Sequence, residues 1–272
     1  MKRFVAVFAL VVMVACAQPV TQRPHYSAQE VRHEQQQQAA AAKAANKSFN
    51  DKKKYNADDI KLMAARLGVI SQPIEQASGQ LCMELTNGKG KCTFVVVLDA
   101  DKKGLNAHAD GQKVVIYPAM IDFTRNDSQL GFVIAHEFAH NIMGHQQALI
   151  QNVTIGAMLG TLIDVAASSQ GSNTQGQFGQ LGAQQGQLRY SSGFEHEADY
   201  VGLYILARAG FKIEDAPMFW REMSLAEPNG IYTSTTHPIN PQRTIEMDRT
   251  VREIRAKQKQ GLPLLPNIKM KT

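Results

Sequence analysis

The sequence has few cysteines, few aromatic residues and no long uninterrupted apolar run. Its 272 residues include three cysteines, and 7% of the residues are aromatic. Three cysteines are too few to hold a small disulfide-rich fold together. We find no apolar run of the about 18–20 residues that a membrane-spanning helix requires. These absences exclude a disulfide scaffold and predict that no helix of the mature chain spans a membrane.

The chain also has only a small excess of positive over negative charge. The formal net charge is +5, and removal of Lys2 and Arg3 with an export signal would leave +3. We see no basic patch interleaved with aromatic residues, so we expect no nucleic-acid partner. The hydrophobic residues, 44% of the chain, are enough for one sizeable core, which excludes extensive disorder.

The N-terminus has the pattern of an export signal. A short basic head precedes an apolar stretch over residues 4–15 that ends in small residues, an order typical of secretory signals. Residues 13–16, Met-Val-Ala-Cys, resemble a bacterial lipobox. We therefore expect a signal peptide of the lipoprotein type over residues 1–16, with Cys16 as the lipidated residue.

This signal also predicts a compartment. Ala17, which follows the cysteine, is not the Asp that retains lipoproteins in the inner membrane. We therefore expect a protein of the bacterial periplasm, held at the outer membrane by its lipid anchor only. The alternative is ordinary signal cleavage at Ala17, which would discard Cys16 and leave a soluble periplasmic protein.

Composition divides the rest of the chain into a tether, one domain and a tail. Residues 17–57 are rich in Gln, Ala and Lys and poor in core-forming residues, which predicts a low-complexity tether. We expect the folded domain over residues 58–260 and a C-terminal tail over residues 261–272. Residues 168–187 are rich in Gly, Gln and Ser and predict a flexible loop, a candidate lid.

Helix and strand patterns follow one another within that domain. One helix is expected from Asp58 to Gly68, and an apolar, buried helix from the cap residue Asn126. Residues 152–167 are also apolar, but Asp164 interrupts them. Strands are expected near residues 80–86, 92–99, 105–109 and 113–117, and further helices at about residues 194–209, 215–226 and 241–258.

Two cysteines flank a turn-rich stretch. Cys82 and Cys92 lie on either side of residues 85–90, and a β-branched run follows. The pattern predicts a hairpin, and an oxidising compartment predicts a disulfide across it. The alternative is a pair of independent buried thiols.

The motif that carries chemistry is H-E-x-x-H at residues 136–140. His136 and His140 lie one turn apart on a helix, so both imidazoles reach one tetrahedral Zn²⁺. Glu137 lies about 100° around the helix from His136, where its carboxylate reaches a water molecule at the metal. Two histidines are costly in a buried apolar helix unless they are paired, which favours a metal site over hydrogen-bonded core histidines.

Such a site needs a third protein ligand and an open fourth position. The helix predicted from residue 194 carries Glu195 on the same face as Gly202, so Glu195 is the expected third ligand. Glu197 lies on a face that we expect to look outward, and it remains the alternative. Asp199, one turn after Glu195, can accept the free N–H of a zinc-bound histidine and fix its tautomer. Gly202 lets the two helices approach closely.

These motifs, with Thr236-His237-Pro238 and Arg243 after them, resemble in type and order those of the HtpX-like and BepA-like gluzincins, relatives of the CAAX prenyl endopeptidase. The similarity spans roughly residues 58–255. It implies an α+β, zincin-like metalloprotease domain, with a small mixed sheet, an edge strand beside the active-site helix and a mainly helical C-terminal part. It also implies that the edge strand bordering the cleft contains Asn106, Ala107, His108 and Ala109.

The same resemblance implies a function. His237 would lie near the metal, where it either stabilises the oxyanion as a catalytic residue or occupies the open zinc position in a resting enzyme. We expect one Zn²⁺ per chain on His136, His140 and Glu195, with Glu137 as the general base. The expected activity is cleavage of extended polypeptides in unfolded or misassembled envelope proteins, with envelope assembly complexes as candidate partners. The alternative is a periplasmic chaperone or assembly factor with a latent zinc site.

Overall fold

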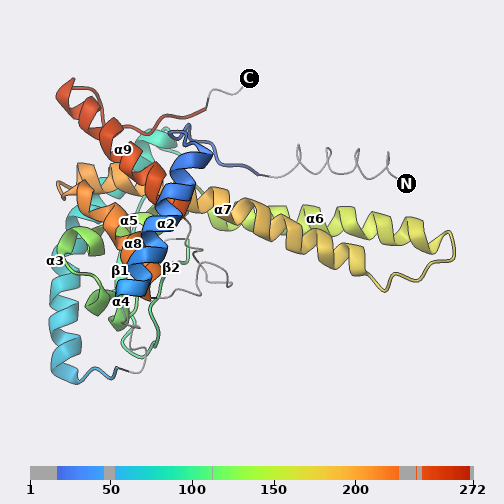
Figure 1. The fold of residues 1–272 in the computed structure, drawn as a ribbon, viewed down its shortest axis with the longest axis horizontal. Helices are drawn as coiled ribbons and strands as arrows, with labels where there is room; N and C mark the ends of the chain where they lie inside the picture. Colours follow the sequence, from blue (N-terminus) through green and yellow to red (C-terminus); the bar gives the residue numbers. More distant parts are fainter. Residues whose placement is uncertain (1–16, 46–52, 112, 227–236, 238–240, 270–272) are drawn as a thin grey trace. The chain divides into compact units, whose positions relative to one another are not determined.

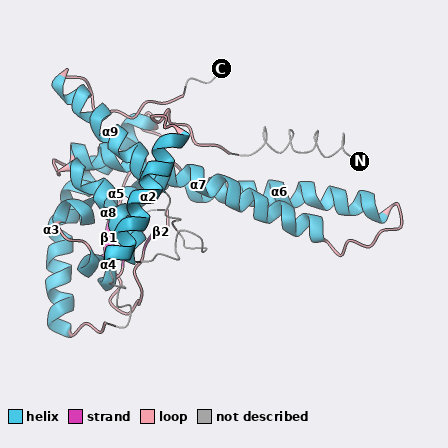
Figure 2. Cartoon of the chain, in the orientation of Figure 1, coloured by secondary structure: helices cyan, strands magenta, loops and turns pink. Residues whose placement is uncertain are grey.

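The computed structural model describes residues 17–45, 53–111, 113–226, 237 and 241–269. The predicted signal peptide and Cys16 lie outside the described residues. Contacts divide the chain into a larger unit, Val20–Met143 with Glu195–Thr272, and a hairpin unit, Met1–Pro19 with Gly144–Phe194. Helices make up most of what is described in both units (Figure 2).

The larger unit contains a small mixed sheet. Its strands are β1 (Val95–Leu98), β2 (Ala107–Ala109) and β3 (Lys113–Ile116), in the order β1-β3-β2. β1 runs parallel to β3, and β2 runs antiparallel to it. The small mixed sheet is therefore confirmed, and so are the strands predicted near residues 92–99, 105–109 and 113–117.

Helix α5 (Asp127–Ile142) lies in the core of the larger unit. It packs against α3 (Ala57–Leu85), α8 (Ala216–Ala226), β2 and β3. Every residue from Gln129 to Ala139 is buried, as expected for a helix that is apolar on all sides. The predicted cap is confirmed, since the Asn126 side chain accepts a hydrogen bond from the backbone N–H of Gln129. The larger unit also contains α2 (Ala28–Ala45), α4 (Pro118–Phe123), the 3₁₀ turn η1 (Ile213–Asp215) and α9 (Pro241–Lys259) (Figure 1).

Helix α3 shows that two predictions were wrong. The helix expected to end at Gly68 continues through Pro73 to Leu85, so there is no strand over residues 80–86. Local penalties for Gly and Pro within a helix are outweighed by burial of one continuous face. The members of that face recur at helical spacing and include Leu67, Ile70, Ile74, Ala77 and Leu81.

Cys82 and Cys92 form a disulfide, but it does not cross a hairpin. Cys82 lies in the last turn of α3, and Cys92 lies in the segment before β1. Between them, Asn87 and Gly88 adopt positive φ angles of 51° and 73°, which reverse the chain. The bridge therefore ties the end of a helix to the segment that leads into the sheet.

Part of the segment predicted as a tether is folded. Helix α2 packs against α8 and α9, and its buried Glu34 accepts a hydrogen bond of 3.0 Å from Nε of Arg221. Before it, Thr21 is fully buried and pairs with Ile268 in an isolated antiparallel bridge. Ion pairing and backbone pairing, rather than apolar burial, hold this segment, which explains why its composition resembles that of a tether.

The hairpin unit consists of α6 (His145–Ser168) and the first part of α7 (Gln177–Arg208), which run side by side (Figure 1). The flexible loop predicted over residues 168–187 is therefore wrong, because much of that stretch is helical. Its glycines serve close packing: a Cβ on Gly156 or Gly182 would collide with backbone atoms of the facing helix.

Helix α6 bears on the prediction that no helix of the mature chain spans a membrane. By length and composition alone, it is the one helix among the described residues that could cross a membrane. Asp164 does not interrupt this helix, because its carboxylate accepts hydrogen bonds from the backbone N–H groups of Phe178 and Gly179. Of the apolar window, 22% is buried within the protein, so α6 is not a core helix.

Candidate metal centre

Helix α5 supplies two histidines to the candidate centre. His136 is 2% exposed and Glu137 is equally buried, because α5 runs through the core. The spacing of one turn places the two imidazoles edge to face, with ring centroids 4.7 Å apart, and Nε2 of His136 lies 3.1 Å from Nε2 of His140. The local arrangement therefore follows directly from the H-E-x-x-H spacing on a helix.

Helix α7 brings the carboxylates. Glu195 and Asp199 lie one turn apart and are both buried, on the side of α7 that faces α5. A Cβ on Gly202 would lie 3.1 Å from the backbone nitrogen of His136, so the two helices approach as closely as the sequence predicted. The absence of a side chain at Gly202 thus brings Glu195 within reach of the histidines.

The predicted outward position of Glu197 is wrong. Glu197 is 2% exposed, and its Oε1 accepts hydrogen bonds of 2.6 and 2.7 Å from the backbone N–H and the hydroxyl of Thr21. Tyr200 and Tyr204 on the same face are also buried. The segment at Thr21 covers Glu197, and Glu253 of α9 accepts hydrogen bonds from the hydroxyls of Tyr200 and Tyr204. Glu197 therefore holds the segment at Thr21 and lies outside the cluster of donor atoms at the centre.

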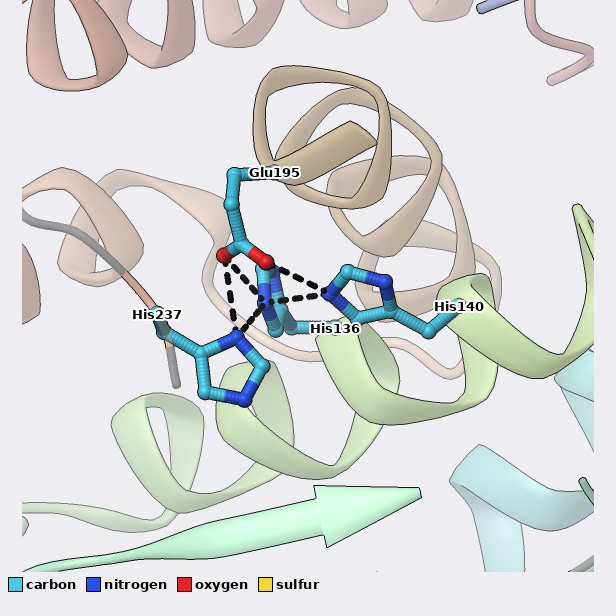
Figure 3. Close-up of side chains that lie close together, drawn as sticks. All are labelled: His136, His140, Glu195 and His237. Carbon is cyan, nitrogen blue, oxygen red and sulfur yellow. Dashed lines mark hydrogen bonds and ion pairs between the residues drawn. The ribbon is translucent and has the colours of Figure 1, made fainter. Parts of the chain in front are cut away.

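Four side chains from three segments converge on one point (Figure 3). Nδ1 of His237 lies 3.4 Å from Nε2 of His136 and 2.9 Å from Oε2 of Glu195. The Glu195 carboxylate lies 3.4 Å from Nε2 of His136 and 3.3 Å from Nε2 of His140. The donor atoms of all four residues lie within 4.8 Å of one another.

These separations fit a tetrahedral metal ion. Ligands at about 2.0–2.2 Å from zinc lie roughly 3.3–3.6 Å from one another, close to the 2.9–3.4 Å between neighbouring donor atoms here. Imidazole nitrogen and carboxylate oxygen are both ordinary zinc ligands. The donor atoms of these four residues therefore fit a zinc site.

A second layer of polar groups holds these ligands. Oδ1 of Asp199 lies 3.0 Å from Nδ1 of His136, which leaves Nε2 of that ring for a metal. The fully buried guanidinium of Arg243 donates hydrogen bonds of 2.6 and 2.8 Å to Asp199 and lies 3.1 Å from Glu195. Trp220 donates a hydrogen bond of 3.1 Å to Asp199. Both carboxylates are therefore fixed in place.

The charges of the centre shift its pKa values in opposite directions. Burial alone would lower the pKa of His136, but Asp199 and Glu195 outweigh it and raise that pKa to about 9. Burial opposes ionisation of Glu195, yet the neighbouring histidines and Arg243 hold its pKa well below the usual range. The pKa of His237 is raised against the effect of burial, mainly by Glu195 and Glu137. Without a metal, the ionised carboxylate of Glu195 thus favours the protonated forms of His136 and His237.

His237 contacts both parts of the candidate machinery. Its Nδ1 joins the donor cluster, and its Nε2 lies 3.3 Å from Oε1 of Glu137. Of its flanking motif, Thr236 and Pro238 lie outside the described residues. His237 therefore adds one donor atom to the cluster and one contact to Glu137.

The predicted edge strand lies beside α5. β2 contains Ala107, His108 and Ala109, while Asn106 just precedes it and accepts a hydrogen bond from the Tyr117 backbone N–H. β2 stands at one end of the three-strand order and packs against α5. The turn after β2 is joined to the end of α5, because Gly111 donates a 2.9 Å hydrogen bond to Asn141.

Sequence reasoning gave no role to Arg243 or Trp220. Arg243 could have been suspected, because it belongs to the motif that follows His237. Trp220 is the one tryptophan of the chain, and nothing in its spacing links it to Asp199. Its indole also lies under the Arg243 guanidinium, 3.8 Å from the ring centroid, a cation–π contact that only the fold reveals.

The part of the chain that carries this centre matches a known protein family. Residues 72–251 match the sequence profile described as Peptidase family M48, and that range contains all four residues of the centre. The match covers more than half of the chain.

Similar curated proteins are much longer. The chain is 34% identical over 121 residues to the "Beta-barrel assembly-enhancing protease" of Yersinia pestis, covering 42% of this chain and 25% of that protein. It is 28% identical over 208 residues to the "Putative beta-barrel assembly-enhancing protease" of Vibrio cholerae, covering 74% and 42%. It is also 28% identical over 146 residues to the "Mitochondrial metalloendopeptidase OMA1" of Saccharomyces cerevisiae, covering 51% and 41%. The matched region thus spans less than half of each relative.

Proposed function

Because the chain belongs to peptidase family M48, we propose that it is a zinc-dependent endopeptidase that cleaves unfolded or misassembled proteins of the cell envelope. The observation that carries the proposal is the convergence of His136, His140 and Glu195 beside Glu137. When bound there, Zn²⁺ supplies a Lewis acid that polarises the scissile carbonyl and lowers the pKa of the attacking water.

The residues of the chain have distinct roles in this proposal. His136, His140 and Glu195 hold the ion, and Asp199 keeps His136 in the tautomer that presents Nε2. Glu137 takes a proton from the attacking water and passes it to the leaving amine. Arg243, which contacts Glu195 and Asp199, is a positioning residue that keeps both carboxylates ionised in the core.

His237 defines a resting form of this enzyme. Its 2.9 Å contact with Glu195 and 3.3 Å contact with Glu137 support its role as a fourth ligand that must leave before substrate binds. A single ring would then keep substrate both from the residues that would hold the ion and from the general base, Glu137. We prefer this role to oxyanion stabilisation, because the ring nitrogen already lies among the ligand atoms.

The proposed substrate is an extended polypeptide. It would add a strand beside Asn106–Ala109, where backbone hydrogen bonds give affinity with little side-chain selectivity. Such a mode suits a protease of unfolded chains. The names of the relatives, together with the predicted export signal, favour a place in the bacterial periplasm, with Cys16 as the site of a lipid anchor to the outer membrane.

The decisive variant is Glu137→Gln. It removes the general base but keeps every proposed ligand, so we expect bound zinc to stay at one ion per chain and cleavage of an unfolded envelope protein to fall by about 10²–10⁴-fold. Asp58→Asn, on the exposed first turn of α3, is the matched control and should cleave normally. Retained activity in Glu137→Gln would refute the role of Glu137.

The position of His237 among the donor atoms also favours a second candidate function. A centre that His237 occupies permanently would be latent, and the protein would act as an envelope assembly factor or chaperone without proteolysis. Envelope assembly in cells that carry Glu137→Gln separates the two functions. Normal assembly in those cells favours the assembly factor, whereas defective assembly with intact zinc content favours the protease.

A further inference from the structure

The outward face of α6 carries large apolar side chains that the hairpin unit leaves in solvent. Ile150, Met158, Leu162 and Val165 are 61–64% exposed, although α6 is a well-formed helix of 24 residues. On a helical projection these four positions fall within about 120°. Two more exposed apolar residues, Phe178 and Leu181, follow on α7.

This face is almost free of charge. Residues 146–188 contain one charged side chain, Asp164, in a chain of which 19% is charged. Asp164 is turned inward, where hydrogen bonds from Thr174 and from the backbone N–H groups of Gly179 and Phe178 lower its pKa. An ordinary water-exposed helix carries charged side chains on its outer face. The lack of charged side chains on this face therefore indicates an apolar partner.

The interior of the hairpin is built from glycine. Gly156 and Gly160 on α6, and Gly182 and Gly186 on α7, leave room only for backbone of the facing helix, since an added Cβ at each would collide with a carbonyl oxygen there. Pairs of small residues spaced by four allow helices to associate without an apolar interior, as helices in lipid do. The large apolar side chains of the unit therefore point outward instead of inward.

Ala17, the first described residue, lies against α6, the helix that carries this surface. Ala17 exchanges hydrogen bonds of 2.6 and 3.0 Å with the Asn152 side chain on α6. Ala17 follows the predicted lipidation site, Cys16, directly. A lipid on that cysteine would therefore be attached one residue before the contact with the helix that carries the exposed apolar residues.

From these contacts we propose that the α6–α7 hairpin is a membrane-binding element that lies in the lipid–water interface, with the outward face of α6 inserted among the acyl chains. The proposal does not depend on the protease function. It adds a protein contact to membrane binding, which the sequence had attributed to a lipid anchor alone.

The hairpin lies in the interface and does not cross the bilayer. The first part of α7 carries Gln177, Gln180, Gln184 and Gln185, and the turn before it is rich in Ser, Asn and Gln. Transfer of these amides into hydrocarbon would cost several kcal/mol each. The apolar face of α6 instead buries its side chains while the glutamines remain at the water side, as in other interfacial helices.

The test uses the chain from Ala17 to Thr272, which carries no acyl group, and vesicles of phosphatidylcholine. We expect this chain to float with the vesicles at low and at high salt, because the proposed surface is uncharged. The double variant Leu162→Asp with Val165→Asp should lose flotation at least about tenfold, since each charge would have to enter the interface. Both sites are exposed, so its unfolding temperature and zinc content should match those of the parent.

The matched control is Leu62→Asp with Val69→Asp. These residues are 71% and 75% exposed on α3 of the larger unit, and the control should float like the parent. A parent that stays with the soluble fraction overturns the proposal, and so does an equal loss in both double variants. A hairpin variant that changes from dimer to monomer with no change in flotation would assign the face to a second copy of the chain and also overturn it.

Discussion

The centre concentrates polar side chains where the protein is otherwise apolar. His136, Glu195, Asp199 and Arg243 are each less than 5% exposed. A buried charge is tolerated only when partners compensate for lost hydration, and here every member faces an opposite charge within 3.4 Å. Such an arrangement costs stability, which is consistent with its retention for chemistry rather than for the fold.

One residue-scale prediction concerns His237. If it is a resting ligand, His237→Ala frees the fourth position and the Glu137 carboxylate, so we expect cleavage to rise several-fold while zinc stays bound by three ligands. If His237 instead stabilises the oxyanion, its loss should lower the cleavage rate about 10²–10³-fold. Initial rates on an unfolded polypeptide, measured with matched zinc content, separate these outcomes.

The residues of the centre were predictable to different degrees. The pair His136 and His140 follows from local helical spacing alone, and Glu195 followed from the shared face with Gly202. His237 needed the family resemblance, because its position depends on a loop. Trp220 could not have been found, since its contact with Asp199 joins two helices whose approach is decided by the whole core.

At the scale of elements, helix approach sets the geometry of the centre. We expect Gly202→Ala to destabilise the protein by about 1–3 kcal/mol and to reduce cleavage, because its Cβ would lie 3.1–3.3 Å from the backbone of residues 135 and 136, which cannot move away alone. Thermal unfolding and zinc affinity measure the two effects.

The chain offers a control for that substitution. Gly68 lies inside α3 on its exposed side, and a Cβ there would meet nothing within 4 Å. Gly68→Ala should therefore stabilise the protein by about 0.5–1 kcal/mol through helix propensity. Equal effects of the two substitutions would contradict the account of close packing between α5 and α7.

Elements were predicted well where one periodicity dominated. Helix α5 and the three strands follow from their apolar patterns. The errors came from glycine, which was interpreted as a helix end at Gly68 and as a sign of a loop over residues 168–187. Burial of the α3 face and backbone contact in the hairpin override those local preferences. Helix α2 escaped prediction because its contacts are ion pairs with distant residues.

At the scale of the whole molecule, the centre links stability to pH and metal. In the metal-free fold the pKa of His136 is raised to about 9, against about 6.5 in an unfolded chain. The stability that this shift contributes is fully present below about pH 6.5 and is lost as the pH rises through about 9. A bound metal requires the neutral ring, so metal binding strengthens over the same range.

As the pH rises, the metal-free fold loses stability while metal binding strengthens, which gives a further prediction. We expect the difference in unfolding temperature between zinc-loaded and chelator-treated protein to widen from pH 6.5 to pH 9, with stabilisation of about 2.7 kcal/mol when free zinc is 100 times its dissociation constant. Thermal unfolding in a series of buffers measures it. A difference that narrows as pH rises would show that His136 does not bind the metal.

The central claim is that side chains of α5 and α7 share one zinc ion. Anomalous diffraction at the zinc absorption edge, from crystals of the zinc-loaded Glu137→Gln variant, tests it most directly. We predict one strong peak per chain, about 2.0–2.2 Å from Nε2 of His136, Nε2 of His140 and a carboxylate oxygen of Glu195. A peak elsewhere in the chain, or no peak between these three side chains, would contradict the claim.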